Sequence, residues 1–188
     1  MANRDNAMGF RVAVKFGPPK CFLFPVDASS STAMFVGDAV VNNAAGSVRP
    51  AAAGFTSTGV GVVQALYDSN MIPVGDVRSS VSTKYLTGSV AGYALVALAI
   101  PGQIFIGQSQ TGTSYAAADI FAAANLVAGS GSTTTARSGH ELGATGGADF
   151  LLLGKVDEPE NAYGSANVDF YFTFLGSTWG QVNPTGGV

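Results

Sequence analysis

Hydrophobic and polar side chains alternate most regularly in the last third of the chain. In the run "NVDFYFTFL" at 167–175, one face carries Val168, Phe170, Phe172 and Phe174, and the other carries Asp169, Tyr171, Thr173 and Leu175. A period of two is typical of a β-strand, whose successive side chains point to opposite faces. The run "ADFLLLGKV" at 148–156 predicts a second strand, and the acidic loop "DEPENAYGSA" between the two is too long for a tight turn.

Short runs rich in Val, Ile, Leu and Tyr continue this pattern through the rest of the chain. They are "CFLFPV" at 21–26, "AMFVGDAVV" at 33–41 with a Gly-Asp kink, "GVGVVQALY" at 59–67, "VSTKYLT" at 81–87, "GYALVALAI" at 92–100 and "IFIGQ" at 104–108. Turn-forming residues separate them, which favours a mainly β, antiparallel sandwich or barrel-like fold. Only "PGQ" separates the last two runs, so we expect them to pair as a hairpin.

One segment breaks the β pattern. The alanine-rich stretch "SYAAADIFAAAN" at 114–125 predicts one short helix, with Ser114 as its cap and Ile120, Phe121 and Leu126 facing inward. The segment 125–131 then becomes the exit from this helix. The segment 133–142 becomes a hydroxyl-rich strand.

The ends of the chain differ in character from its centre. Residues 1–20 carry scattered charges without a sustained period and end at "GPPK", which predicts an extended N-terminal arm. Residues 21–188 form one β-rich domain in this interpretation, or two lobes at 21–100 and 101–180. No internal repeat is evident, so a solenoid is not expected.

The charge content changes the functional picture. Charged residues make up 11% of the 188 residues, against about 25% in ordinary proteins, and the net charge is -3. A nucleic-acid-binding protein would show a basic stripe, so we expect no nucleic-acid partner. A chain so poor in charge is expected to bury much of its surface against other proteins, because the centres of interfaces are depleted of charge.

Signals for export and membrane insertion are weak. The first eleven residues, "MANRDNAMGFR", lack the apolar core of a signal peptide, which favours synthesis in the cytoplasm. The apolar stretch at 90–106 is broken by Pro101 and is shorter than the ~20 residues that span a bilayer. Cys21 is the single cysteine, which excludes an internal disulfide, and its apolar neighbours predict a buried thiol.

Candidate chemistry centres on His140, the only histidine. Ser138 and Glu141 flank it, but adjacent strand residues face opposite sides, so a triad would have to recruit a distant acid such as Asp149. The glycines at 129–131 match neither a P-loop nor a dinucleotide fingerprint. The acidic cluster at 157–161 does not match a calcium loop. We therefore expect no enzyme activity, no cofactor and no metal.

Several stretches, in this order, resemble the capsid decoration or cement proteins of tailed bacteriophages. They are "MANRDNAMGFR", "AMFVGDAVV" with "GVGVVQALY", "STKYL", "NLVAGSGSTTTARSGHEL" at 125–142 and "LLLGKVDEPENAYGSANVDFYF" at 151–172. The segment "YALVALAIPGQ" and the tail from Trp179 to Val188 depart from the pattern. The resemblance implies a β-rich protein on the outer surface of the virion, bound as a trimer to the major capsid protein.

Two functions from different classes remain at this stage. For a decoration protein, we expect contacts to the capsid or to other subunits from Arg4, Met8, Phe10, Arg11, Arg137 and His140. The alternative is a β-sandwich adhesin that binds a glycan or a host surface receptor, with an exposed aromatic residue such as Trp179 stacking on the ligand.

Overall fold

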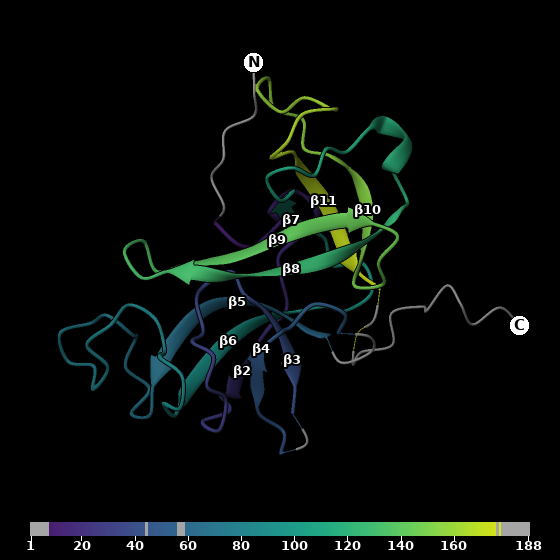
Figure 1. The fold of residues 1–188 in the computed structure, drawn as a ribbon. Helices are drawn as coiled ribbons and strands as arrows, with labels where there is room; N and C mark the ends of the chain where they lie inside the picture. The colour runs from purple at the N-terminus through teal and green to yellow at the C-terminus, as the bar shows by residue number, and fades with distance from the viewer. Residues whose placement is uncertain (1–7, 44, 56–58, 176, 178–188) are drawn as a thin grey trace, which may run out of the picture.

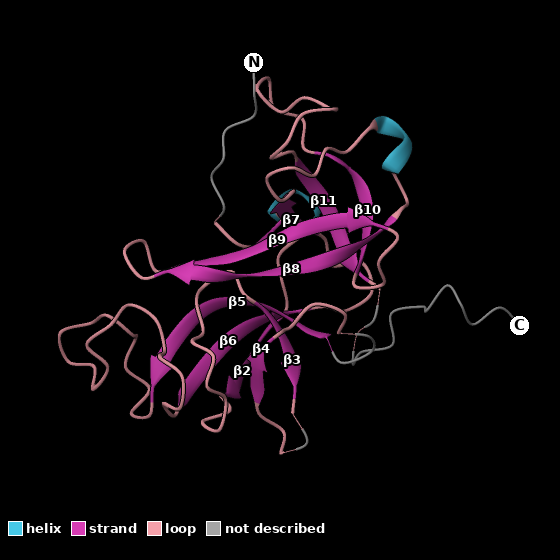
Figure 2. Cartoon of the chain, in the orientation of Figure 1, coloured by secondary structure: helices cyan, strands magenta, loops and turns pink. Residues whose placement is uncertain are grey.

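The computed structural model describes residues 8–43, 45–55, 59–175 and 177. Within them the chain forms two antiparallel β-sheets and only two single-turn 3₁₀ helices, η1 (Val14–Phe16) and η2 (Ala117–Asp119). Figure 1 shows the two sheets as separate layers, and Figure 2 shows how much of the remainder is loop. The prediction of a mainly antiparallel β-sandwich or barrel-like fold is confirmed.

The six-stranded sheet contains most of the C-terminal half of the chain. Its strands are, in spatial order, β1 (Arg11–Val12), β7 (Phe105–Gln108), β11 (Asp169–Phe174), β10 (Phe150–Lys155), β8 (Ala123–Ser132) and β9 (Arg137–Thr145). The alternation predicted for β11 is present: Phe170, Phe172 and Phe174 are fully buried, and the residues between them are half-buried. One face of this sheet therefore lines the core.

The five-stranded sheet contains most of the N-terminal half. Its strands are β2 (Cys21–Pro25), β6 (Gly92–Leu98), β5 (Gly59–Asp68), β3 (Ala39–Asn42) and β4 (Val48–Pro50). A parallel bridge between Val26 and Val48 brings the chain after β2 beside β4. The sheet is therefore curled, with its two edge strands approaching one another.

Both faces of the curled sheet are buried, which explains its uninterrupted apolar runs. Val62 and Ala97 point into the core shared with the six-stranded sheet. Their neighbours Val63 and Val96 point into a second core inside the curl. A strand covered on one face alternates, whereas a strand covered on both faces needs apolar residues at every position.

Aromatic rings fill the space between the sheets. Phe150 on β10 lies at the centre of this cluster, with ring centroids 5.2 Å from Phe10, 5.5 Å from Phe55, 4.7 Å from Phe172 and 5.1 Å from Phe174. Most of these pairs meet edge to face, the geometry that aromatic quadrupoles favour. Segments from both ends of the chain thus meet at one ring.

The predicted helix at 114–125 is wrong. The segment contains only the short turn η2, and its end enters β8, which pairs with β9 on one side and β10 on the other. Pairing on two edges outweighs the helix propensity of alanine, which is a weak local preference. The expected strand at 133–142 is likewise displaced: residues 133–136 form a turn and β9 spans Arg137–Thr145.

Two further predictions about strands are wrong. Strands β6 and β7 do not form a hairpin, because the turn between them carries the chain from one sheet to the other. The segment 81–87 is not a strand; only Leu86 forms a bridge, to Met34. Each of these runs has the composition of a strand, but the sequence does not specify which strand it pairs with.

The N-terminal arm is shorter than expected. Arg11 and Val12 form β1 against β7, and the Phe10 ring is 2% exposed within the main core. The expected arm therefore forms part of the sandwich from Phe10 onward, because the core takes up an apolar side chain that a free arm would leave in water. Residues 1–7 lie outside the described residues.

Replacement of Phe150 by alanine should lower the free energy of unfolding by about 3–5 kcal/mol, because it empties the centre of the aromatic cluster. Urea or thermal unfolding measures the loss. The matched control is Phe121→Ala, since the Phe121 side chain is 73% exposed and should change stability little. Equal effects of the two substitutions would contradict the assignment of Phe150 to the centre of the core.

Candidate functional site

The structure brings His140 next to an acidic residue that the sequence analysis did not select. His140 lies on β9, and Asp38 directly precedes β3 in the other sheet. The His140 Nε2 atom and the Asp38 Oδ1 atom are 3.7 Å apart, and the two side chains are 4% and 3% exposed. A buried polar pair therefore links the two sheets.

Backbone contacts define the state of the imidazole. The Ala39 N–H group donates a hydrogen bond to His140 Nδ1 at 3.1 Å, so a neutral ring carries its proton on Nε2. Burial lowers the pKa of His140, against the opposing effect of the Asp38 carboxylate. The ring is therefore neutral at neutral pH, with its proton on Nε2, the atom that lies 3.7 Å from Asp38 Oδ1.

The Asp38 carboxylate is held by its own chain segment. Its Oδ2 atom accepts a hydrogen bond from the Phe35 N–H group at 2.8 Å. Burial raises the pKa of Asp38, while His140 and a hydrogen bond from the Ser138 side chain act in the opposite direction. The desolvation effect is the largest, as expected for a carboxyl group taken out of water.

The order of these groups differs from that of a nucleophilic triad. Ser138 Oγ accepts a hydrogen bond from the His140 backbone N–H at 2.9 Å. Activation of a serine requires its hydroxyl to lie on the imidazole, with the acid on the far side of the ring. Here Ser138 Oγ accepts from the backbone of His140, and the imidazole Nδ1 accepts from the backbone of Ala39.

Asp149, the acid that a triad would have needed, instead accepts hydrogen bonds from backbone N–H groups of other segments. Its Oδ2 atom accepts hydrogen bonds from the N–H groups of Gly54 and Leu126, at 3.1 and 2.7 Å. The structure therefore pairs His140 with Asp38 and uses Asp149 to join β8 to the segment after β4.

A cavity of about 390 Å³ lies over the buried pair. Asp38 and His140 line it together with Phe35 and Tyr85, whose rings stack at 4.6 Å and 19°. Four hydroxyl side chains also line it: Thr32, Thr87, Ser130 and Thr133. The volume falls within the range of about 300–1,000 Å³ typical of small-molecule sites.

A glycine on β8 makes room for one wall of this cavity. A Cβ atom on Gly131 would lie 2.3 Å from the Phe35 ring, which is closer than any carbon–carbon contact allows. Gly131 thus serves close packing against an aromatic ring, and the cavity could not keep its shape with a larger residue there.

The residues predicted as contacts are distributed over several regions. Met8 is 38% exposed, and Arg11 forms an exposed ion pair with Asp169 at 3.4 Å. Arg137 is exposed at the start of β9. Phe10 and His140 are both buried, so neither side chain is free to serve as a surface contact in this fold. Arg4 lies outside the described residues.

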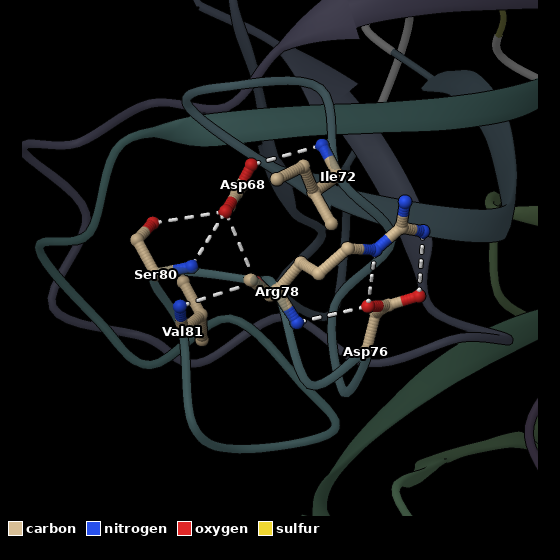
Figure 3. A network of polar contacts seen from close by, with 7 residues as sticks. Asp68, Ile72, Asp76, Arg78, Ser80 and Val81 are labelled. Carbon is tan, nitrogen blue, oxygen red and sulfur yellow. Dashed lines mark hydrogen bonds and ion pairs between the residues drawn. The ribbon is translucent and has the colours of Figure 1, made fainter.

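A second polar network organises the long loop after β5 (Figure 3). Asp68 accepts hydrogen bonds from the backbone of Asn70, Ile72 and Ser80 and from the hydroxyls of Ser79 and Ser80. These bonds hold the pKa of Asp68 well below its ordinary value. Because all these donors come from the loop itself, the network closes the loop onto the end of β5.

Other kinds of site find little support in the part of the chain that the structure describes. Its helices are single turns, so none has the length or apolar character needed to cross a membrane. No group of three or more histidine, cysteine or acidic side chains gathers there to hold a metal ion. Cys21 is half-buried, and burial raises the pKa of its thiol.

Comparison of the chain with protein-family models, curated proteins and solved structures found no match. The site therefore has to be interpreted from its own residues.

The sequence contained one usable signal for this site and missed the rest. His140 stood out as the only histidine. For Asp38 the sequence pattern predicts only a place in a kinked strand, and for Phe35 and Tyr85 it predicts ordinary strand positions. Their assembly depends on the packing of two sheets, which no local pattern encodes.

Replacement of His140 by glutamine should change how stability depends on pH. An unfolded histidine takes up a proton near pH 6.5, whereas the buried ring has a lower pKa and resists protonation. Because the unfolded state then binds more protons, the wild-type protein loses stability as pH falls below 6.5. Relative to His140→Gln, the loss should reach at most about 1.4 kcal/mol per pH unit.

Urea unfolding between pH 7.5 and 5 measures this difference. Glutamine retains an oxygen that can accept the Ala39 N–H bond, and the chain contains no other histidine to obscure the result. Parallel stability curves for the two proteins would show that His140 titrates normally.

Proposed function

We propose that this protein is a structural, non-enzymatic component of a phage head that binds the outer surface of the major capsid protein lattice and stabilises the expanded shell. The sequence resemblance to decoration proteins supports this function. The observation that carries it in the structure is the concentration of exposed apolar side chains in the N-terminal segment.

The exposed apolar side chains are concentrated in one segment, which indicates a contact surface. Nine large apolar side chains are exposed in the described residues, and five of them lie within residues 8–23. These five, here called the N-terminal surface, are Met8, Val14, Phe16, Phe22 and Leu23. Exposed apolar side chains that cluster are typical of sites of protein association.

The two edge strands in this segment strengthen the argument. Strand β1 is the outer strand of one sheet and β2 of the other, and residues 13–20 connect the two directly. In β2, Phe22 and Leu23 are exposed although they point to opposite faces. An apolar edge strand invites pairing with another chain unless it is protected.

The charged side chains of the same segment are all basic. Residues 8–23 contain Arg11, Lys15 and Lys20 and no acidic residue, although acids outnumber bases in the whole chain. A basic, apolar surface suits a partner surface with carboxylates around an apolar groove. In this proposal Lys15 and Lys20 join Arg11, which the sequence already suggested as a contact.

Stabilisation of a shell by such a protein follows from mass action. A subunit that binds only the expanded lattice stabilises it by RT ln(1 + [L]/Kd) at each site. A homotrimer would present three copies of the N-terminal surface at once, so that modest contacts add up to strong attachment.

Replacement of Phe22 by serine should weaken binding to expanded heads by about tenfold or more, since burying a phenylalanine side chain contributes about 1.5–3 kcal/mol. Co-sedimentation of purified protein with decoration-free heads measures the affinity. The control is Phe121→Ser, which removes a phenylalanine elsewhere that is 73% exposed, against 59% for Phe22. Equal affinity of Phe22→Ser and wild type, or equal weakening by both variants, would contradict the proposed surface.

The oligomeric state provides a separate prediction. We expect a particle of about three times the 19.0 kDa chain mass in sedimentation or light-scattering measurements. A monomer at every concentration tested would contradict the trimer while leaving the capsid surface open to the binding assay above.

The alternative function, a glycan- or receptor-binding adhesin, makes the opposite prediction in the same assays. An adhesin would not co-sediment with heads at lattice stoichiometry. Trp179, the residue first considered for stacking on a glycan, lies outside the described residues.

A further inference from the structure

We propose that the cavity above Asp38 and His140 binds a neutral saccharide, one hydroxyl of which bridges Asp38 Oδ1 and His140 Nε2 from the cavity side. None of the residues that line the cavity belongs to the N-terminal surface. The inference therefore goes beyond capsid binding and does not depend on it.

The base of the cavity selects the kind of group that can bind. His140 Nε2 carries a proton because Nδ1 accepts the Ala39 N–H bond, so Nε2 is a donor. Asp38 Oδ1 is an acceptor. The 3.7 Å between them is too long for a hydrogen bond, so a third group can satisfy both atoms.

Only a group that both donates and accepts fits this pair. A hydroxyl accepts from Nε2–H and donates to Oδ1. An ammonium group has no acceptor for the imidazole N–H, and a carboxylate or phosphate has no proton for Asp38. A water molecule also meets the requirement, but the cavity of about 390 Å³ has room for a much larger ligand.

The walls extend this selection from one hydroxyl to a polyhydroxylated ring. Thr32, Thr87, Ser130 and Thr133 place hydroxyl groups around the cavity, each able to donate and to accept. The side chains of Phe35 and Tyr85 supply an apolar wall for the carbon skeleton of a sugar. A few polar groups within an apolar wall are typical of small-molecule sites.

Charge restricts the class further. The residues that line the cavity include Asp38 but no lysine or arginine. An acidic sugar would meet a buried carboxyl group without a cation to offset the repulsion. We therefore expect neutral saccharides to bind and sialic or uronic acids to be rejected.

Binding to an array of immobilised glycans, with neutral and with acidic terminal sugars, tests the class of ligand. Titration with free glucose, galactose and mannose, followed by ligand-observed NMR, distinguishes a site for a sugar unit from one that requires an extended glycan. Binding to neutral glycans in either format supports the inference.

Two variants and one control locate the site. Ser130→Trp changes an exposed residue at the cavity wall and should fill the cavity, which reduces binding by at least tenfold. Asp38→Asn replaces one carboxyl oxygen with an NH₂ donor and should weaken binding by about tenfold, the loss expected for one hydrogen bond. Thr134→Trp, in the exposed turn outside the cavity, should bind as wild type does.

Three results would overturn the inference: absence of binding to every neutral saccharide, undiminished binding by Ser130→Trp, or preference for acidic sugars. Because Ser130 is exposed, a folded Ser130→Trp protein keeps the test decisive even if Asp38→Asn unfolds. Co-sedimentation with heads is measured on the same proteins, so that loss of saccharide binding is distinguished from loss of capsid binding.

Discussion

The packing of phenylalanine rings between the two sheets is the interaction on which the rest of the structure depends. Phe150, Phe172 and Phe174 come from adjacent strands of the six-stranded sheet, and Phe10 and Phe55 reach them from distant segments. The same buried cluster includes Ala124 and Leu126 of β8, Leu142 of β9 and Ala39 of β3. It therefore packs the strand that carries His140 against the strand that follows Asp38.

Burial of that polar pair sets its chemistry. A carboxyl group and an imidazole that leave water are destabilised unless other polar groups replace the lost hydration. The backbone N–H groups of Phe35 and Ala39 provide part of this replacement. The gap between Oδ1 and Nε2 leaves the pair able to engage one more hydroxyl, and this separates it from both a salt bridge and a catalytic triad.

The N-terminal segment and the cavity divide the molecule into two kinds of surface. Along residues 8–23, apolar and basic side chains lie on the outer strands of both sheets, as expected for attachment to a larger surface. The cavity is small, hydroxyl-lined and acidic at its base. Attachment through one surface would leave the other free, so the two proposed functions are compatible.

By itself, the sequence determined the fold class and most strands, because alternation in β11 and short apolar runs elsewhere are local properties. Propensity failed at 114–125, where pairing of β8 with two neighbours overrides the preference of alanine. The partners of β6 and β7 were not predictable, because the pattern of a strand buried on both faces does not indicate which sheet the strand joins. The site was decided by tertiary structure alone: Asp38 and His140 belong to different sheets, and only the packing of those sheets brings them together.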